Sequence, residues 1–181
     1  EHFFDEANYS TIIPGHIEYA LTFLNEMGYE DDATLLQYIT IGTYEYDQRI
    51  FDPTDVSGWP GNRSWITSSS YPFRVDSIHQ ILIYYYVAQG NSLEHLRSFV
   101  FSFINPNEND PAIVSKSIVD YLLPKGLQKQ SEYDEALKVF KAEIPENYFE
   151  SGQWNMYWEY APGQVYFLLS YLASLPEFQL R

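Results

Sequence analysis

The residue types best suited to chemistry gather between residues 52 and 74. Aromatic rings, guanidinium groups and carboxylates occur there within a short stretch: Trp59, Trp65, Arg63, Arg74, Asp52 and Asp55. Sugar-binding clefts combine such groups, because the C–H faces of a pyranose pack on rings and its hydroxyls bond to carboxylates and guanidinium donors. We therefore predict that these six residues bind a ligand. The competing interpretation is that the rings fill the core and an Arg–Asp pair holds the loop.

A second aromatic segment lies between residues 145 and 161. Six rings occur there among acidic and amide residues: Tyr148, Phe149, Trp154, Tyr157, Trp158 and Tyr160. We predict that Trp154 and Trp158 belong to the same ligand-binding surface as the first segment.

Catalysis would need a pair of positioned carboxylates, close together or wider apart according to the mechanism of a glycoside hydrolase. Several acids are candidates for such a pair: Asp5, Glu6, Asp52, Asp55 and Glu159. Nothing in their spacing selects two of them, and the catalytic residues stay unknown. The sequence has no nucleophile elbow, no phosphate-binding loop and no dinucleotide-binding glycine motif. Whether the protein is an enzyme is left open.

One spacing matches a metal site. His2, Asp5 and Glu6 would share a helical face, but His2 lies at the very start of the chain, and a solvated face is the preferred interpretation. We therefore predict no metal and no cofactor. The other histidines are isolated in sequence and are expected to be capping or core residues: His16, His79 and His95. The absence of Cys excludes disulfides, thiolate zinc sites and Cys nucleophiles.

The composition excludes two classes of partner. The chain has 181 residues, of which 45% are apolar and 18% aromatic, and a formal net charge of −15. Nucleic-acid binding needs clustered Lys and Arg, whereas the ten basic residues here are scattered. The longest apolar run, 81–88, is far shorter than the ~20 residues of a membrane span. The acidic surface fits solubility, a cationic partner or weak calcium sites.

Hydrophobic periodicity predicts a series of helices. The first two cover residues 14–27 and 32–42, the second capped by Asp31 or Asp32. A helix over 71–89 is preferred to a buried strand at 81–87, because the whole segment is too long for one strand. Four further helices begin at Ser92, Asp110, Ser131 and Pro162, and Ser131 with Asp134 resembles a capping box. We expect an all-α fold, one domain over residues 1–181 with six or seven helices around one core. Two long aromatic-rich loops, 43–70 and 145–161, would lie on its surface.

The segment from Phe51 to Ile66 carries a specific resemblance. Its Phe51-Asp52-Pro53 and Gly58-Trp59-Pro60-Gly61 resemble the F-x-P-P-N-V-x-G-W-P-G-G-x-x-W-I segment of the bacterial family called domain of unknown function 1800. Arg74 stands where that family has an arginine in the next helix. Thr54-Asp55 replaces the usual Pro-Asn, and Asn62 replaces a glycine. The resemblance implies the C-terminal part of a larger, exported bacterial protein, located in the periplasm or outside the cell, and it implies no known activity.

We expect a non-catalytic module that binds a glycan or a protein partner through the Trp59–Trp65 loop. The alternative is a hydrolase, of which this chain supplies one wall and the N-terminal region of the same protein completes the site. A third interpretation is a structural domain that completes the fold of that N-terminal region. Exposure of the tryptophan rings distinguishes these interpretations, since buried rings favour a scaffold.

Overall fold

The computed structural model describes residues 13–29, 32–43, 48–49, 51–59 and 61–180. Within these ranges every regular element is helical, apart from one isolated bridge between Asp55 and Gly58. The all-α prediction is therefore confirmed. The chain divides into two compact units, Glu1–Tyr84 with Gln179–Arg181, and Tyr85–Phe178. They are called the first and second unit below, and the expectation of one domain stays a prediction.

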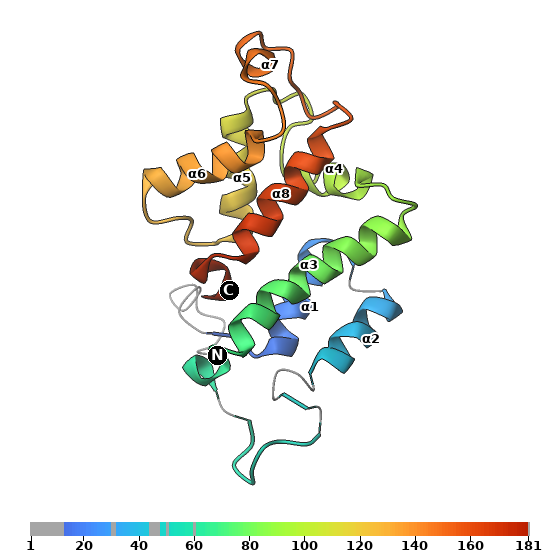
Figure 1. Ribbon diagram of the computed structural model, residues 1–181, viewed down its shortest axis with the longest axis vertical. Helices are drawn as coiled ribbons and strands as arrows, with labels where there is room; N and C mark the ends of the chain where they lie inside the picture. Colours follow the sequence, from blue (N-terminus) through green and yellow to red (C-terminus); the bar gives the residue numbers. More distant parts are fainter. Residues whose placement is uncertain (1–12, 30–31, 44–47, 50, 60, 181) are drawn as a thin grey trace. The chain divides into compact units, whose positions relative to one another are not determined.

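The first unit contains α1 (His16–Glu26), α2 (Ala33–Gly42), the 3₁₀ turn η3 (Asn62–Trp65) and most of α3 (Ser70–Ala88). Helices α1 and α2 pack on each other (Figure 1). Asp32 caps α2 as predicted, since its Oδ1 accepts hydrogen bonds from Thr34 N at 2.9 Å and Leu35 N at 3.0 Å. Asp31 lies outside the described residues.

Helix α3 resolves the one ambiguous segment of the sequence. It is continuous over Ser70–Ala88, so the buried-strand alternative is wrong. Ile78, Ile81 and Leu82 are all fully buried, at the i, i+3, i+4 spacing of one helical face. Gly90 follows with φ of 68°, a left-handed conformation that ends a helix and that glycine adopts without steric cost.

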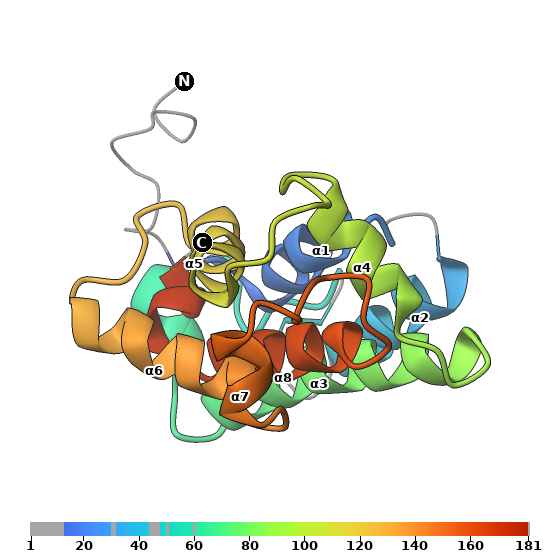
Figure 2. The ribbon, with the colours of Figure 1, turned by 90° about the horizontal axis from the view of Figure 1, so that it is seen from above.

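The second unit contains α4 (Glu94–Phe101), α5 (Pro111–Leu122), α6 (Gln130–Lys141), α7 (Glu146–Glu150) and α8 (Ala161–Ala173). A second 3₁₀ turn, η4 (Pro176–Leu180), follows α8. Helix α8 packs on both α6 and α4, and α5 packs on α6 (Figures 1 and 2). Because α8 meets helices on more than one side, its sequence is apolar nearly all round, and eight of its residues are buried.

The predicted helix starts in the second unit are right at one position and displaced at others. Asp110 caps α5, with Oδ1 accepting from Ala112 N at 2.8 Å. Ser92 contacts the start of α4 through Glu94 N at 3.2 Å, but the helix itself begins at Glu94. The capping box of Ser131 with Asp134 is wrong. Helix α6 begins at Gln130, and the Glu132 carboxylate accepts from Lys129 N and Gln128 N, both at 3.0 Å.

The second aromatic segment is less irregular than its composition suggests. It contains the short helix α7, and for this reason the part of the chain that the structure describes has eight α-helices rather than six or seven. The first predicted loop contains only η3 as a helical element among its described residues.

Candidate functional site

The first predicted segment is largely exposed. Asp52, Asp55 and Arg63 are exposed, Trp59 has 40% of its surface exposed, and Trp65 is partly buried. A hollow of about 280 Å³ lies in this segment, and it is lined by Arg49, Asp52, Pro53 and Thr54 and by no aromatic ring. The two tryptophans therefore do not face a shared hollow at this place.

Asp55 forms the turn of this segment with its own neighbours. Its Oδ1 accepts hydrogen bonds from Ser57 N at 2.7 Å and from the Ser57 hydroxyl. The hydroxyl, and then the backbone N–H, lower the pKa of Asp55. Gly58 N closes the turn on Asp55 O at 3.1 Å, and Gly58 has φ of 103°, which other residues rarely adopt. The Asp55 carboxylate thus already has a structural role.

Arg74 is buried in the first unit and does not reach a surface groove. Only 1% of its surface is exposed. Its Nε donates to Gln179 Oε1 at 2.7 Å and its Nη1 donates to Pro14 O at 3.0 Å, while its guanidinium lies 4.2 Å from the centre of the Tyr19 ring. These bonds do not support the predicted contact of Arg74 with a ligand. To reach a ligand, Arg74 would have to break them, and its buried charge would lose these acceptors.

Trp154 is likewise a core residue. It is fully buried, and its ring packs edge-on against Phe140 at 5.8 Å between ring centres. Its Nε1 donates to Gln164 Oε1 at 2.8 Å, and Gln164 Nε2 donates to Phe140 O at 2.8 Å. A ligand cannot contact this ring without opening the core, so the predicted role of Trp154 as a ligand contact is not supported by its position.

Two hollows with shared walls lie in the second unit. The larger, here called the loop hollow, has about 770 Å³ and is lined by Glu143, Ile144, Pro145, Tyr148, Trp158, Glu159 and Tyr160. The other, here called the α8 hollow, has about 570 Å³. The two share Glu143, Ile144, Glu159 and Tyr160. Both volumes lie within the range of about 300–1,000 Å³ typical of small-molecule sites.

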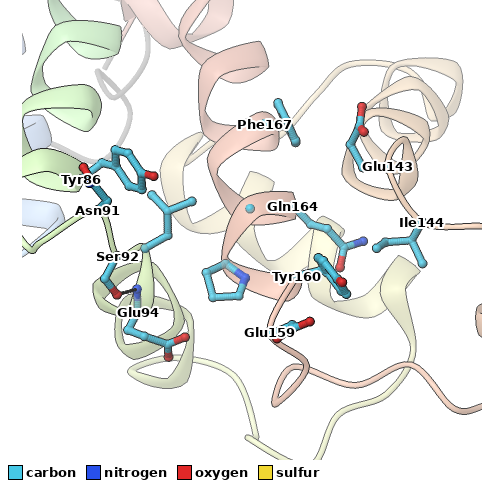
Figure 3. A pocket seen from close by; sticks show the side chains of 13 residues that line it. Tyr86, Asn91, Ser92, Glu94, Glu143, Ile144, Glu159, Tyr160, Gln164 and Phe167 are labelled. Atoms are coloured by element: carbon cyan, nitrogen blue, oxygen red, sulfur yellow. Dashed lines mark hydrogen bonds between the residues drawn. The ribbon is translucent and has the colours of Figure 1, made fainter.

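The α8 hollow is assembled from three places in the chain. Figure 3 shows Tyr86, Asn91, Ser92 and Glu94 on one side, Glu143 and Ile144 on the other, and Gln164 between them. Phe167, also on α8, and Tyr160 with Glu159 belong to the lining as well. Of the residues proposed from sequence, only Trp158 lines either hollow, together with the catalytic candidate Glu159.

Arg97 on α4 fixes the backbone of the second aromatic segment next to Trp158. Its Nη2 donates to Trp158 O at 2.9 Å, and its Nη1 donates to Met156 O. The same guanidinium bonds the Glu94 carboxylate through Nε at 2.7 Å and Nη2 at 2.9 Å. This contact with Arg97 lowers the pKa of Glu94. One side chain therefore joins α4 to the aromatic wall of the loop hollow.

The exposed tyrosine of this wall sits beside an acid. Tyr160 has 59% of its surface exposed, and a hydrogen bond with Glu159 raises the pKa of the Tyr160 hydroxyl. Tyr148 and Trp158 are partly buried and meet edge to face, with 5.0 Å between ring centres. Rings and carboxylates thus occur together here, as the sequence had suggested for residues 52–74, but with tyrosine hydroxyls in place of the guanidinium groups expected there.

The isolated histidines occupy the core or its edge. His16 is buried with 2% exposed, and burial, then the nearby Arg74 charge, lower its pKa to about 3. His95 is partly buried beside Tyr85, and burial lowers its pKa to about 4. Both are neutral near pH 7, as core histidines are. His79 is partly buried.

The remaining catalytic and metal candidates fall in separate parts of the chain. His2, Asp5 and Glu6 lie outside the described residues. Asp52 and Asp55 belong to the first unit and Glu159 to the second. Among the residues that the structure describes, no group of three or more His, Asp or Glu side chains could hold a metal ion. No helix in that same part of the chain is long and apolar enough to span a bilayer.

Sequence could not have identified Tyr86, Glu94, Glu143 and Phe167 as companions of Tyr160. They come from different helices and helix ends, and nothing in their spacing relates them. The only available signal was the aromatic density of residues 145–161.

Comparison with known protein families gives a match over nearly the whole chain. A family model described as "Protein of unknown function (DUF1800)" matches residues 4–180. No curated protein and no solved structure matches the chain.

Proposed function

For a chain that belongs to the DUF1800 family of proteins of unknown function, we propose a non-catalytic role in recognition, in which the second unit binds a glycan. The observation that carries the proposal is the loop hollow, where Tyr148, Trp158 and Tyr160 lie beside Glu143 and Glu159. The rings offer faces for the C–H surface of a pyranose, and the carboxylates accept hydrogen bonds from its hydroxyls. The site proposed from sequence thus moves from the Trp59–Trp65 loop to the loop hollow.

Two features support a preformed site. Arg97 holds the carbonyls of Met156 and Trp158, and Gln164 holds the indole of Trp154, so the segment is fixed at three points. A wall ordered before binding loses less conformational entropy when a ligand arrives, which raises affinity.

We also propose an extracytoplasmic location, where such a module would meet polysaccharide. Cell fractionation of a producing bacterium would test it, and recovery of the protein in the cytoplasm alone would contradict it.

The experiment uses two tyrosines that differ chiefly in position. Tyr157 and Tyr160 each have 59% of their surface exposed, but only Tyr160 lines the hollows. The chain is first screened on a glycan array, and the best ligand is then titrated by calorimetry against both alanine variants. We expect Tyr160→Ala to weaken binding at least ~10-fold, about 1.4 kcal/mol, and Tyr157→Ala to leave affinity unchanged.

Equal losses in the two variants would place the ligand elsewhere, and the absence of any glycan ligand would refute the proposal. Trp59→Ala serves as a second control, because it tests the surface originally predicted from sequence. A loss of affinity confined to Trp59→Ala would return the site to the first unit.

A further inference from the structure

We propose that the glycan recognised by the two hollows is cationic, with a free ammonium group on its sugar units. The inference rests on the proposed function and names the class of glycan. It follows from the charge of the lining, from its balance of hydrogen-bond donors and acceptors, and from its rings.

The lining is negative and carries no basic side chain. Glu94, Glu143 and Glu159 line the hollows, whereas no Lys, Arg or His does. Glu94 is neutralised by Arg97, which it meets through two hydrogen bonds. No ion pair among the described residues neutralises Glu143 or Glu159. These two carboxylates belong to both hollows, so the uncompensated charge lies where the hollows share a wall.

The hydrogen-bonding groups favour a donor. A carboxylate only accepts, a protonated amine only donates, and a sugar hydroxyl does both. The amide of Gln164 is already engaged, since its oxygen accepts from Trp154 and its nitrogen donates to Phe140. Glu159 accepts one hydrogen bond from the Tyr160 hydroxyl, and the other carboxylate oxygen sites of Glu143 and Glu159 remain for a ligand. An ammonium group offers these sites three donors together with the opposite charge, which a neutral sugar does not carry.

The rings favour the same group. Tyr148, Trp158 and Tyr160 line the loop hollow, and Tyr86 and Phe167 line the α8 hollow. A cation over the face of an aromatic ring is attracted by about 0.5–2 kcal/mol, most strongly at Trp. The same faces pack against the apolar side of a pyranose, so one wall suits both parts of an amino sugar. The net charge of −15 adds long-range attraction for a polycation.

The test compares two ligands that differ in charge. Hexamers of β-1,4-linked glucosamine and of N-acetylglucosamine share length and linkage, but only the first carries amines. Calorimetry at mildly acidic pH, where the amines are protonated, should show the glucosamine hexamer binding at least ~10-fold more tightly, about 1.4 kcal/mol. That preference should shrink as salt is added, because exposed charges are screened.

The protein variants locate the charge. Glu143→Gln and Glu159→Gln preserve shape and remove one charge each, and both should reduce the preference for the glucosamine hexamer. Glu150→Gln is the matched control, since Glu150 is exposed on α7 and lines neither hollow. An unaltered preference in both test variants would overturn the inference, and so would an equal effect of Glu150→Gln.

Two further outcomes separate this inference from the proposed function. Equal affinity for the two hexamers would overturn the cationic class while leaving glycan recognition in place. Binding of neither hexamer, nor of any glycan on the array, would overturn both. A trilysine peptide is the last arm, and affinity for it equal to that for the glucosamine hexamer would overturn the choice of a sugar as carrier of the ammonium group.

Discussion

At the scale of single residues, the four tryptophans differ in how much of each ring remains accessible. Trp59 is 40% exposed, Trp65 and Trp158 are partly buried, and Trp154 is fully buried. Their surroundings differ accordingly. Trp158 lines the loop hollow, whereas Trp154 is held by Gln164 inside the core. An identical residue type therefore serves packing at one position and lines a hollow four residues later.

Truncation should separate these roles by stability. We expect Trp154→Ala to cost about 3–5 kcal/mol, because it removes a large buried ring and leaves a cavity. Trp59→Ala should cost less than about 1 kcal/mol, as substitutions at exposed sites do. Urea unfolding followed by circular dichroism measures both. A loss at Trp59 as large as that at Trp154 would contradict the exposure of Trp59 seen here.

Arg97 provides a second prediction at this scale, as a positioning residue. Arg97→Lys keeps the charge but cannot reach two carbonyls and a carboxylate together, since a single ammonium lacks the planar fork of guanidinium. We expect the amides of residues 155–160 to exchange with deuterium faster in Arg97→Lys, while those of α5 and α6 keep their wild-type rates. Mass spectrometry of peptides from the exchanged protein measures deuterium uptake in residues 155–160 and in α5 and α6 in the same experiment. Unchanged exchange at residues 155–160 would show that Arg97 does not hold this segment.

At the scale of elements, the start of each helix depends on local side chains, and these determine how far sequence can predict it. Asp32 and Asp110 were identifiable because a cap acts within three residues. The start of α6 was placed wrongly because three acids, Glu132, Asp134 and Glu135, lie within four positions and each could serve a cap at a different register. Only the folded backbone selects Glu132.

The cap of α5 can be tested directly. Asp110→Ala removes the acceptor for Ala112 N and should destabilise the protein by about 1 kcal/mol. Asp110→Asn is the matched control, because asparagine caps helices nearly as well as aspartate. Thermal unfolding of the three proteins should therefore rank wild type and Asp110→Asn together, above Asp110→Ala. Equal melting temperatures for all three proteins would show that the Asp110 cap does not stabilise α5.

At the scale of the whole molecule, residues far apart in sequence complete the interior of each unit. Gln179 accepts from Arg74 and donates to Tyr19 at 3.2 Å, so the first unit contains three residues spread over 160 positions. His16 is buried near Arg74 in the same interior, and the pKa of its imidazole falls to about 3. We therefore expect the stability of the chain to be sensitive to acid.

The direction of that sensitivity follows from proton binding. His16 has an ordinary pKa of 6.5 when unfolded and about 3 when folded. Above pH 6.5 both states are neutral at this site, and below it the unfolded state alone gains a proton, down to about pH 3. Folding stability should therefore fall by about 2 kcal/mol between pH 7.5 and 5 through His16.

The measurement compares variants at the two pH values. In His16→Gln the fall in the free energy of urea unfolding between pH 7.5 and 5 should be smaller than in wild type by that amount. His79→Gln makes the same substitution at a partly buried site and should retain the acid sensitivity. A wild-type pH dependence in His16→Gln would indicate that this imidazole is not kept neutral by folding.

What sequence alone determined are the properties that act over short distances. Helical periodicity, caps at Asp32 and Asp110, and the glycine stop at Gly90 depend on residues within about one turn of each other, and all were predictable. The motif around Trp59 gave the family for the same reason, because it is contiguous.

Only tertiary structure decided which rings are buried and which side chains meet. The sequence suggested that Arg74 and Trp154 contact a ligand at the surface. In the folded chain Arg74 instead bonds Gln179, 105 positions away, and Trp154 bonds Gln164, 10 positions away. Glu94, Glu143 and Glu159 likewise share a hollow because α8 packs on α4 and α6. Burial and charge compensation are properties of that three-dimensional contact, and no local spacing encodes them.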